Sequence, residues 1–285
     1  MKKIPVRQIN SIEREASFKR FSIRKVQDLA GSQGLIQDLH RHDFFFILAL
    51  QKGMGSHDID FIPYEVSDNS VFFLRLGQVH QLELKAGCIG YLMEFNTEFY
   101  HPTEKQAILR LRKASNKNFC IPDTVRFEKL FDLLKYIFQE YIEKEEGYLD
   151  IIKANLDIFF IELVRQSTDP KSHSTNGSAY TQERLEEFLE LLETHITTHK
   201  QVSQYTELMN LSHYQLNEIT KVTVGKTASQ LINERIILEA KRYLLATSNQ
   251  IKDIADHLGY EDVSYFIRFF RKQSGYSPES FRSKY

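Results

Sequence analysis

The residues best suited to chemistry in this sequence lie near its C-terminal end, in a stretch whose apolar residues recur at helical spacing. One face of such a helix carries the apolar side chains of Val263, Phe266, Phe269 and Phe270. The opposite face carries Ser264, Ile267, Arg268, Arg271 and Lys272. Arginine can donate two parallel hydrogen bonds to guanine, serine can bond either kind of base edge, an apolar side chain can contact a thymine methyl, and basic side chains bind phosphates. This face therefore fits the major groove of DNA.

The elements that must position this face occur twice. Residues 202–232 align with residues 251–281, and each copy reads as a short helix, a tight turn, a second helix and a glycine at its end. The turn and final glycine are Asn210 and Gly225 in the first copy, and Gly259 and Gly275 in the second. This pattern predicts two helix-turn-helix motifs.

A helix over residues 227–246 is expected to join the two motifs. Its ~20 residues would span ~30 Å, close to the ~34 Å between successive major-groove openings on one face of DNA. One chain could then read two adjacent grooves. For a single copy, the alternative is an ordinary helical bundle with a charged outer surface, and the duplication is what favours DNA binding.

The preceding part of the chain has a different pattern. Residues 18–112 alternate β-branched and aromatic runs with turn signals, which predicts an all-β sandwich or barrel. Apolar residues three and four apart predict helices over 124–146 and 148–165 that could also bury a subunit interface. Residues 167–178 are rich in Ser, Thr, Asn, Gly and Pro and predict a linker.

Composition excludes several classes of protein. The longest apolar run, Phe44–Leu50, is far shorter than the ~20 residues that a membrane-spanning helix needs. The N-terminus contains no apolar stretch of the ~7–15 residues that a secretory signal requires, so we expect a cytoplasmic protein that does not associate with membranes. Cys88 and Cys120 form no Cys-x-x-Cys pair. The formal net charge is −1, and a basic excess is confined to residues 263–285.

Two sets of motifs carry a resemblance to a known family. The runs I-A-D-H-L-G-Y, S-Y-F-I-R-F-F-R-K and G-Y-S-P-E-S-F-R, all within residues 254–282, resemble the signature of AraC-type transcription regulators. The run HRHDFFFILAL, the G-x-G-x-H turn at 53–57 and FFLRLGQVHQL resemble the cupin-like, sugar-responsive domains attached to many such regulators. The resemblance covers most of the chain.

The resemblance implies particular base-reading positions. They are Tyr214, Asn217 and Glu218 in the first motif, and Ser264, Ile267 and Arg268 in the second. His213 and Lys221 flank the first set, as Arg271 and Lys272 flank the second. Glu218 departs from the family, which commonly has arginine there, and a carboxylate facing phosphates weakens binding. We therefore expect the second motif to dominate affinity.

His40, His42 and His80 are the candidate ligand-binding residues of the cupin-like domain. His40 and His42 would lie on one face of a strand, as metal-binding cupin enzymes require. However, the carboxylate ligand that follows in those enzymes is absent, so we expect no metal. The histidines could instead cap strands near a pocket mouth or bond a small ligand. Asp150 and Asp157 are expected to be solvated charges.

These observations predict an α+β multidomain protein. Residues 1–166 would form a cupin-like β-barrel with two helices, for effector binding and dimerisation, and 167–180 a linker. Residues 181–285 would form an all-α DNA-binding domain with two helix-turn-helix motifs joined by a linker helix.

We predict a sequence-specific transcription regulator, not an enzyme, that binds promoter DNA as a homodimer and needs no cofactor. A small-molecule effector could modulate it, unless the cupin-like domain has lost ligand binding, and family habit favours activation through RNA polymerase. The alternatives are a metal-dependent cupin enzyme with a helical interaction tail, and a DNA-binding protein without an effector.

Overall fold

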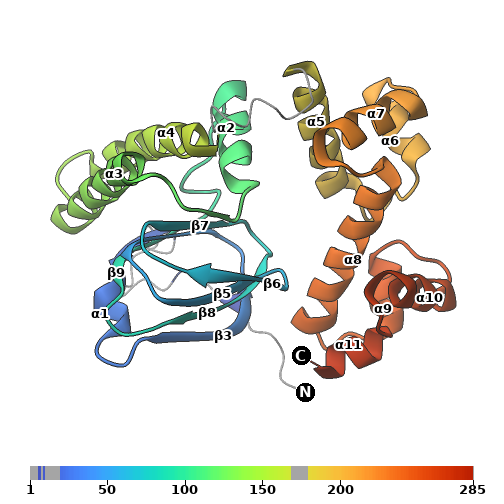
Figure 1. The fold of residues 1–285 in the computed structure, drawn as a ribbon, viewed down its shortest axis with the longest axis horizontal. Coiled ribbons are helices and arrows are strands. Elements are labelled where there is room, and N and C mark those ends of the chain that lie inside the picture. The colour runs from blue at the N-terminus through green and yellow to red at the C-terminus, as the bar shows by residue number, and fades with distance from the viewer. Residues whose placement is uncertain (1–5, 8, 10–19, 168–178, 285) are drawn as a thin grey trace. The chain divides into compact units, whose positions relative to one another are not determined.

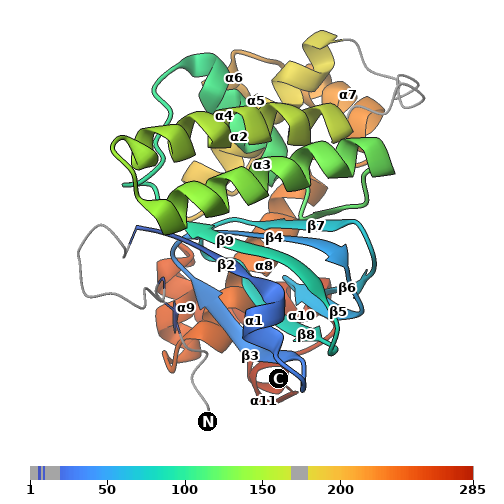
Figure 2. The same ribbon diagram turned by 90° about the vertical axis from the view of Figure 1, so that its left-hand side faces the viewer.

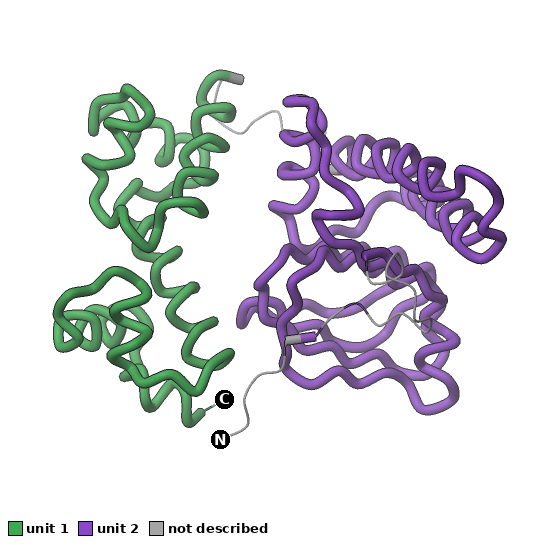
Figure 3. Tube along the Cα trace, turned by 180° about the vertical axis from the view of Figure 1, so that it is seen from behind, with its two compact units in different colours: residues 1–3, 170–285 green, residues 4–169 purple. Residues whose placement is uncertain are grey.

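A computed structural model describes residues 6–7, 9, 20–167 and 179–284 of the chain. These residues form two compact units, one up to Ser167 and one from Ala179 to Lys284 (Figure 3). We call them the β unit and the helical unit. The predicted linker, residues 167–180, falls almost entirely outside the described ranges. No helix of the described residues is long and apolar enough to cross a membrane.

The β unit consists of two five-stranded sheets and a layer of helices (Figures 1 and 2). The first sheet contains, in order, β1 (Val6–Arg7), β3 (Leu35–His42), β8 (Val79–Leu84), β5 (Gly55–Ile59) and β6 (Ile62–Val66). The second contains β10 (Phe119–Cys120), β7 (Ser70–Leu74), β4 (Phe45–Lys52), β9 (Ile89–Phe95) and β2 (Phe21–Lys25). A short helix, α1 (Val26–Ala30), follows β2.

The apolar run of β4 explains how the layers are held together. Successive side chains of a strand point to opposite faces. Phe46, Leu48 and Leu50 enter the core between the sheets, whereas Phe45 and Ile47 enter a second core beneath the helices. β4 lies between β7 and β9, so both faces of this strand are buried and the run needs no polar residue.

Three helices form the second core with the outer face of the second sheet (Figure 2). They are α2 (Lys105–Ser115), α3 (Thr124–Glu143) and α4 (Tyr148–Ser167). α3 ends three residues earlier than the predicted helix over 124–146, because Lys144 adopts a left-handed conformation, with φ of 54°. The two predicted helices and the cupin-like arrangement of sheets are confirmed.

Two details of the all-β prediction for residues 18–112 were wrong. α2 is helical from Lys105, because Ile108, Leu111 and Ala114 recur at helical rather than strand spacing and its apolar side chains face the second sheet. The run from His40 to Gln51 is not one strand, since a turn at Asp43–Phe44 divides it between the two sheets.

The helical unit contains seven helices among its described residues. They are α5 (Ala179–His195), α6 (Val202–Met209), α7 (His213–Val224), α8 (Ala228–Ala246), α9 (Ile251–His257), α10 (Val263–Ser274) and α11 (Pro278–Lys284). α8 runs between a group formed by α5, α6 and α7 and a group formed by α9, α10 and α11 (Figure 1).

The two helix-turn-helix motifs are α6–α7 and α9–α10, as the sequence repeat predicts. Asn210 and Gly259 form the turns with left-handed φ of 51° and 72°. A Cβ at Gly259 would lie 2.0 Å from the carbonyl oxygen of Thr197, so only glycine fits this turn. The recognition helices α7 and α10 end at left-handed glycines, Gly225 and Gly275.

Candidate functional site

The outward face of α10 is an exposed, basic surface. Its predicted residues are all exposed to solvent: Ser264, Ile267, Arg268, Arg271 and Lys272. The opposite side buries Phe266 and Phe270 completely. The helix therefore divides into a core face and a solvent face along the register that the apolar spacing predicts.

The packing beneath α10 fixes the direction of this face. The Phe270 ring lies 5.8 Å from that of Phe281 on α11, and the Phe266 ring lies 5.3 Å from that of Tyr260. At the start of the helix, the Asp262 carboxylate accepts a 2.7 Å hydrogen bond from the Ser264 amide. A helix anchored by aromatic contacts and a capped end presents its basic side chains in a defined orientation.

Tyr265 is an exposed residue of α10 that we did not single out from the sequence. More than half of its surface is open to solvent. It precedes Arg268 by three residues and Lys272 by seven, a spacing that places all three on one side of the helix. This spacing in the sequence could have identified Tyr265 as part of the exposed face.

Arg282 is occupied within the fold. Its guanidinium donates to the carbonyl oxygens of Leu244, at 2.9 Å, and Asn249, at 2.7 Å. These bonds join α11 to the end of α8, so this basic residue stabilises the second motif and does not extend the surface of α10.

The corresponding face of α7 has a different charge. His213, Tyr214, Glu218 and Lys221 are exposed, with Tyr214 the most open of them at 74%. This face of α7 carries one acidic and one basic residue, Glu218 and Lys221, whereas the outward face of α10 carries three basic residues. The electrostatic attraction to phosphate is therefore weaker at α7 than at α10.

Asn217 is engaged inside the helical unit. Its Nδ2 donates to the carbonyl oxygen of His213 at 3.0 Å, and its Oδ1 accepts from the amide of Ala228 at 3.1 Å. Ala228 is the first residue of α8, so the Asn217 side chain satisfies an amide that has no partner within that helix. These bonds favour a structural role over the predicted base-reading role.

The candidate ligand-binding histidines lie together in the interior of the β unit. His40, His42 and His80 are at most 2% exposed, so they are not at a pocket mouth. The His80 ring lies 4.1 Å from that of His40 and 4.9 Å from that of His42. The His42 ring stacks 5.5 Å from Phe46 of the second sheet, which places the group between the sheets.

A fourth histidine, His57 on β5, completes this group, which we call the histidine cluster. Its Nε2 lies 2.9 Å from Nδ1 of His80, at hydrogen-bond distance. The G-x-G-x-H motif predicts a turn at His57, but this residue lies on a strand. The alternation of β5 was the missed signal, because His57 and Ile59 are buried while Ser56 and Asp58 are exposed.

Several nitrogens of the cluster have no hydrogen-bond partner in the described part of the chain. His40 and His42 each donate Nδ1–H to a backbone carbonyl, that of Asp38 at 2.7 Å and that of Phe44 at 2.8 Å. Nε2 of His42, Nδ1 of His57 and Nε2 of His80 are buried without a partner. Unpaired buried polar atoms are costly, and a bound ligand could satisfy them.

Burial keeps the cluster uncharged. Desolvation lowers the pKa of His40 to about 4 and the pKa values of His42 and His57 to about 3, and it lowers the pKa of His80 well below its ordinary value. Among the described residues, no three His, Cys, Asp or Glu side chains are placed to hold a metal ion. The arrangement is suited to hydrogen bonding by neutral imidazoles.

Asp157 is not the solvated charge that the sequence suggests. It is half-buried on α4 and accepts a 2.6 Å hydrogen bond from the hydroxyl of Tyr100. Burial, together with this bond, raises the pKa of Tyr100. The partner could not be predicted, because it lies 57 residues away on the segment between β9 and α2.

Comparison with known proteins gives two family matches. A helix-turn-helix domain family matches residues 205–284, and an AraC-like ligand-binding domain family matches residues 30–143. The HTH-type transcriptional activator RhaS of Escherichia coli O157:H7 (strain EC4115 / EHEC) is 24% identical over 249 residues, covering 85% of this chain and 86% of RhaS. RhaS of Citrobacter koseri is 25% identical over 248 residues, with the same shares. The crystal structure of ToxT from Vibrio cholerae O395 aligns with 93% of this chain and 98% of its own, with a TM-score of 0.42 and 15% identity.

Proposed function

The chain belongs to the AraC-type family of transcription regulators, and we propose that it activates transcription by reading promoter DNA mainly through α10. The observation that carries this proposal is the exposed side of α10, where three basic residues stand together with Ser264 and Ile267 and the opposite side packs in an aromatic core.

In this proposal the residues of α10 have distinct roles. Arg268 is placed to donate two hydrogen bonds to a guanine, and Ser264 and Ile267 contact neighbouring base edges. Arg271 and Lys272 bind phosphates and set the register on the duplex. α7 occupies the adjacent groove with His213, Tyr214, Glu218 and Lys221 and contributes less affinity, because Glu218 opposes the attraction to phosphate.

The length of α8 supports the use of two grooves. Its 19 residues, at about 1.5 Å each, separate the motifs by roughly 28 Å. This approaches the ~34 Å that separates successive major-groove openings on one DNA face. The expected operator half-site therefore contains two short recognition elements about one helical turn apart.

We propose that the β unit binds a small-molecule effector at the histidine cluster. The unpaired nitrogens of His42, His57 and His80 are available to hydroxyl or carbonyl groups once the interior opens. Binding at this position would change the packing of the sheets against α3 and α4, and the end of α4 leads into the predicted linker. An effector that binds one arrangement better than another shifts the equilibrium between them.

We also propose that the protein acts as a homodimer on DNA and contacts RNA polymerase. α3 exposes Val125, Tyr136 and Ile142, and α4 exposes Ile158, so both predicted interface helices keep apolar surface to contribute. Sedimentation velocity tests the dimer. Tyr136→Glu is expected to shift the protein towards monomer, whereas a glutamate in place of exposed Leu208 on α6 should not.

The first experiment selects sheared genomic DNA with purified protein at ~150 mM salt and sequences the retained fragments, because salt suppresses binding driven by phosphates alone. A shared motif with two elements about one helical turn apart is expected. Retention of unrelated fragments, with Arg268→Ala behaving like the wild type, would contradict base reading by α10.

We propose no catalytic step for this chain. The competing function is that of a metal-dependent cupin enzyme, in which the histidines would hold the ion. Elemental analysis of purified protein distinguishes the two functions. Stoichiometric iron, zinc or manganese that is lost in His42→Gln would favour the enzyme, whereas substoichiometric metal with selective DNA retention would favour the regulator.

A further inference from the structure

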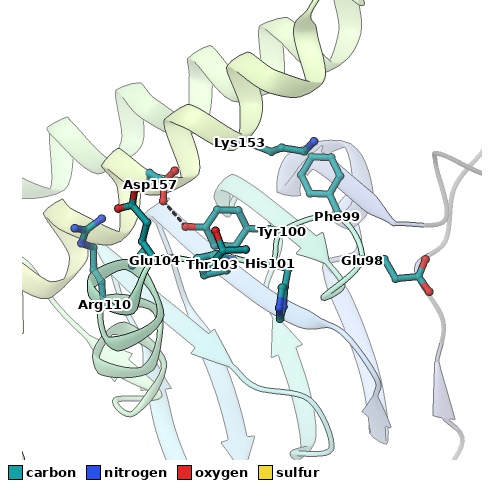
Figure 4. Close-up of a pocket in the computed structure, with 11 residues that line it drawn as sticks. Glu98, Phe99, Tyr100, His101, Thr103, Glu104, Arg110, Lys153 and Asp157 are labelled. Carbon is teal, nitrogen blue, oxygen red and sulfur yellow. Dashed lines mark hydrogen bonds between the residues drawn. The ribbon is translucent and has the colours of Figure 1, made fainter.

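A cavity of about 480 Å³ lies outside the barrel, within the helical layer of the β unit (Figure 4). It is bounded by the segment that joins β9 to α2, by the first turns of α2, and by the middle of α4. Its volume falls in the roughly 300–1,000 Å³ range of small-molecule sites. It shares no lining residue with the histidine cluster.

The cavity has a polar pair and an aromatic wall. Phe99 and Tyr100 are buried by more than nine-tenths, and the Tyr100 hydroxyl points to the Asp157 carboxylate (Figure 4). Because Tyr100 donates to Oδ1 of Asp157, the second carboxylate oxygen can accept from a ligand. Glu104, at the start of α2, lines the cavity beside Asp157 (Figure 4).

Two cations face this cavity from different helices. Arg110, half-buried on α2, has no hydrogen-bond or ion-pair partner among the described residues. Lys153, on α4, lies 5.7 Å from the centre of the Phe99 ring and 3.5 Å from Asp150. A guanidinium that forms no ion pair with the described residues, in one cavity with an acceptor carboxylate, suits a ligand that carries a carboxylate at one end and hydrogen-bond donors at the other.

We propose that this cavity is a second ligand site, which binds a small carboxylic acid bearing hydroxyl or amino groups. Arg110 binds the carboxylate with help from Lys153, Asp157 and Glu104 accept from the hydroxyl or amino groups, and Phe99 packs against the carbon skeleton. The charges fit such a ligand, since the cavity presents both signs.

The regulatory consequence of this site rests on the proposed function. Asp157 and Lys153 lie on α4, whose last residue, Ser167, is the first residue of the predicted linker, and Arg110 lies on α2, which packs against α4. A ligand bridging Arg110 and Asp157 would join these two helices. Its binding energy would then favour one position of α4 over others.

The test measures binding of defined probes to the full chain by thermal shift and calorimetry. Galacturonate and gluconate represent hydroxy acids, and serine and glutamine represent amino acids. Galactose lacks the carboxylate, and acetate lacks the donors. At least one of the first four is expected to bind saturably and raise the melting temperature, while galactose and acetate do not.

Matched variants locate the binding. Arg110→Gln and Asp157→Asn are each expected to weaken the binding probe at least tenfold, whereas Lys129→Gln and Asp132→Asn, exposed changes of the same kind on α3, should leave it unchanged. His42→Gln, in the histidine cluster, should also leave it unchanged. Circular dichroism checks folding, and Arg110→Gln alone is decisive if Asp157→Asn does not fold.

Three results would overturn the proposal: no probe in the panel binds, Arg110→Gln binds as well as the wild type, or His42→Gln abolishes binding. The probe-binding measurement uses no DNA, so it tests the second ligand site independently of the proposed function. If the protein selected no DNA, the proposed function would be contradicted, but the ligand site would still stand or fall by the binding of the probes. A bound probe that leaves the DNA footprint unchanged would contradict the regulatory role of the site.

Discussion

At the scale of single residues, α10 separates base reading from phosphate binding. Arg268→Ala is expected to cost about 1–3 kcal/mol of binding free energy on the selected operator and to relax the base preference at one position. Lys272→Ala should weaken all sequences alike and reduce the salt dependence by about one unit. Fluorescence anisotropy on operator and scrambled duplexes, at several salt concentrations, measures both effects. Equal losses on the two duplexes for Arg268→Ala would remove this residue from base reading.

For Asn217 on α7 we expect a substitution to change stability and to leave base preference unchanged. Because its side chain accepts from the Ala228 amide, Asn217→Ala should lower the free energy of unfolding by about 1 kcal/mol. Affinity for DNA should fall to the same extent on operator and scrambled duplexes, since no base contact is lost. Urea denaturation and anisotropy test this pair of effects, and Glu218→Gln, a neighbouring exposed change, serves as the control for the denaturation alone. A change in base preference with unchanged stability would restore the base-reading role.

At the scale of elements, each helix-turn-helix depends on a small apolar core. Leu258, at the end of α9, is 1% exposed, and Leu258→Ala should cost about 2–5 kcal/mol of unfolding free energy by leaving a cavity. Leu208 on α6 is 45% exposed, and the same substitution there should cost far less. Urea denaturation compares them. Similar losses for the two variants would show that the second motif is not held by this core.

The helices could be predicted from the sequence because their boundaries are encoded locally. Ser212 caps α7 by accepting from the Gln215 amide, and Gly225 ends this helix, so both signals lie within a few residues of the element. The strands were harder. A turn at Asp43–Phe44 lies at the start of an apolar run and contains no glycine or proline, and α2 was missed between strand-like segments.

The candidate sites could be predicted only where local periodicity decides exposure. The outward face of α10 follows from the spacing of Phe266 and Phe270. The bond from Ala228 to Asn217 joins two helices, and the contact of His57 with His80 joins strands 23 residues apart. Long-range pairs of this kind depend on tertiary packing, which apolar spacing does not report.

At the scale of the whole molecule, the net charge conceals where DNA would bind. The chain carries 37 basic and 38 acidic residues, yet the exposed side of α10 is strongly basic. Attraction to phosphate falls off within about 10 Å at 0.1 M salt, so a local surface of this size acts independently of the distant acidic residues.

The two units should also respond differently to acid. The four buried histidines stay neutral in the folded β unit, with pKa values of about 4 for His40 and about 3 for His42 and His57, and lower than usual for His80. In the unfolded chain they bind protons near pH 6.5. Their contribution to stability is therefore present above about pH 6.5 and is lost as the pH falls from there, towards 4 for His40 and towards 3 for His42 and His57, by up to about 1.4 kcal/mol per pH unit for each histidine.

Other shifted groups do not reverse this trend above pH 5. Burial raises the pKa of Glu94, so the folded protein binds a proton at this carboxyl more readily than the unfolded chain does. This opposes the acid-induced loss of stability, but only in the pH range where Glu94 takes up its proton, near its ordinary value of 4.5 or above. Arg7 lies close enough to lower the pKa of His40, His42 and His80 further. In the helical unit, the shifted groups of the described residues are Lys200, Lys241, Tyr205 and Tyr260, whose ordinary values are near 10.

Lowering the pH from 7.5 to 5 should consequently unfold the β unit at a lower temperature while the helical unit keeps its melting temperature. Calorimetry of the full chain would then resolve two transitions that separate as the pH falls, and the transition that moves should be the one that galacturonate or another β-unit ligand shifts. Replacing His57 with glutamine removes one proton-binding group and should make the lower transition less dependent on pH. A single transition that stays constant between pH 7.5 and 5 would mean that the histidines are not buried as neutral groups, and the effector site proposed at the histidine cluster would lose its basis.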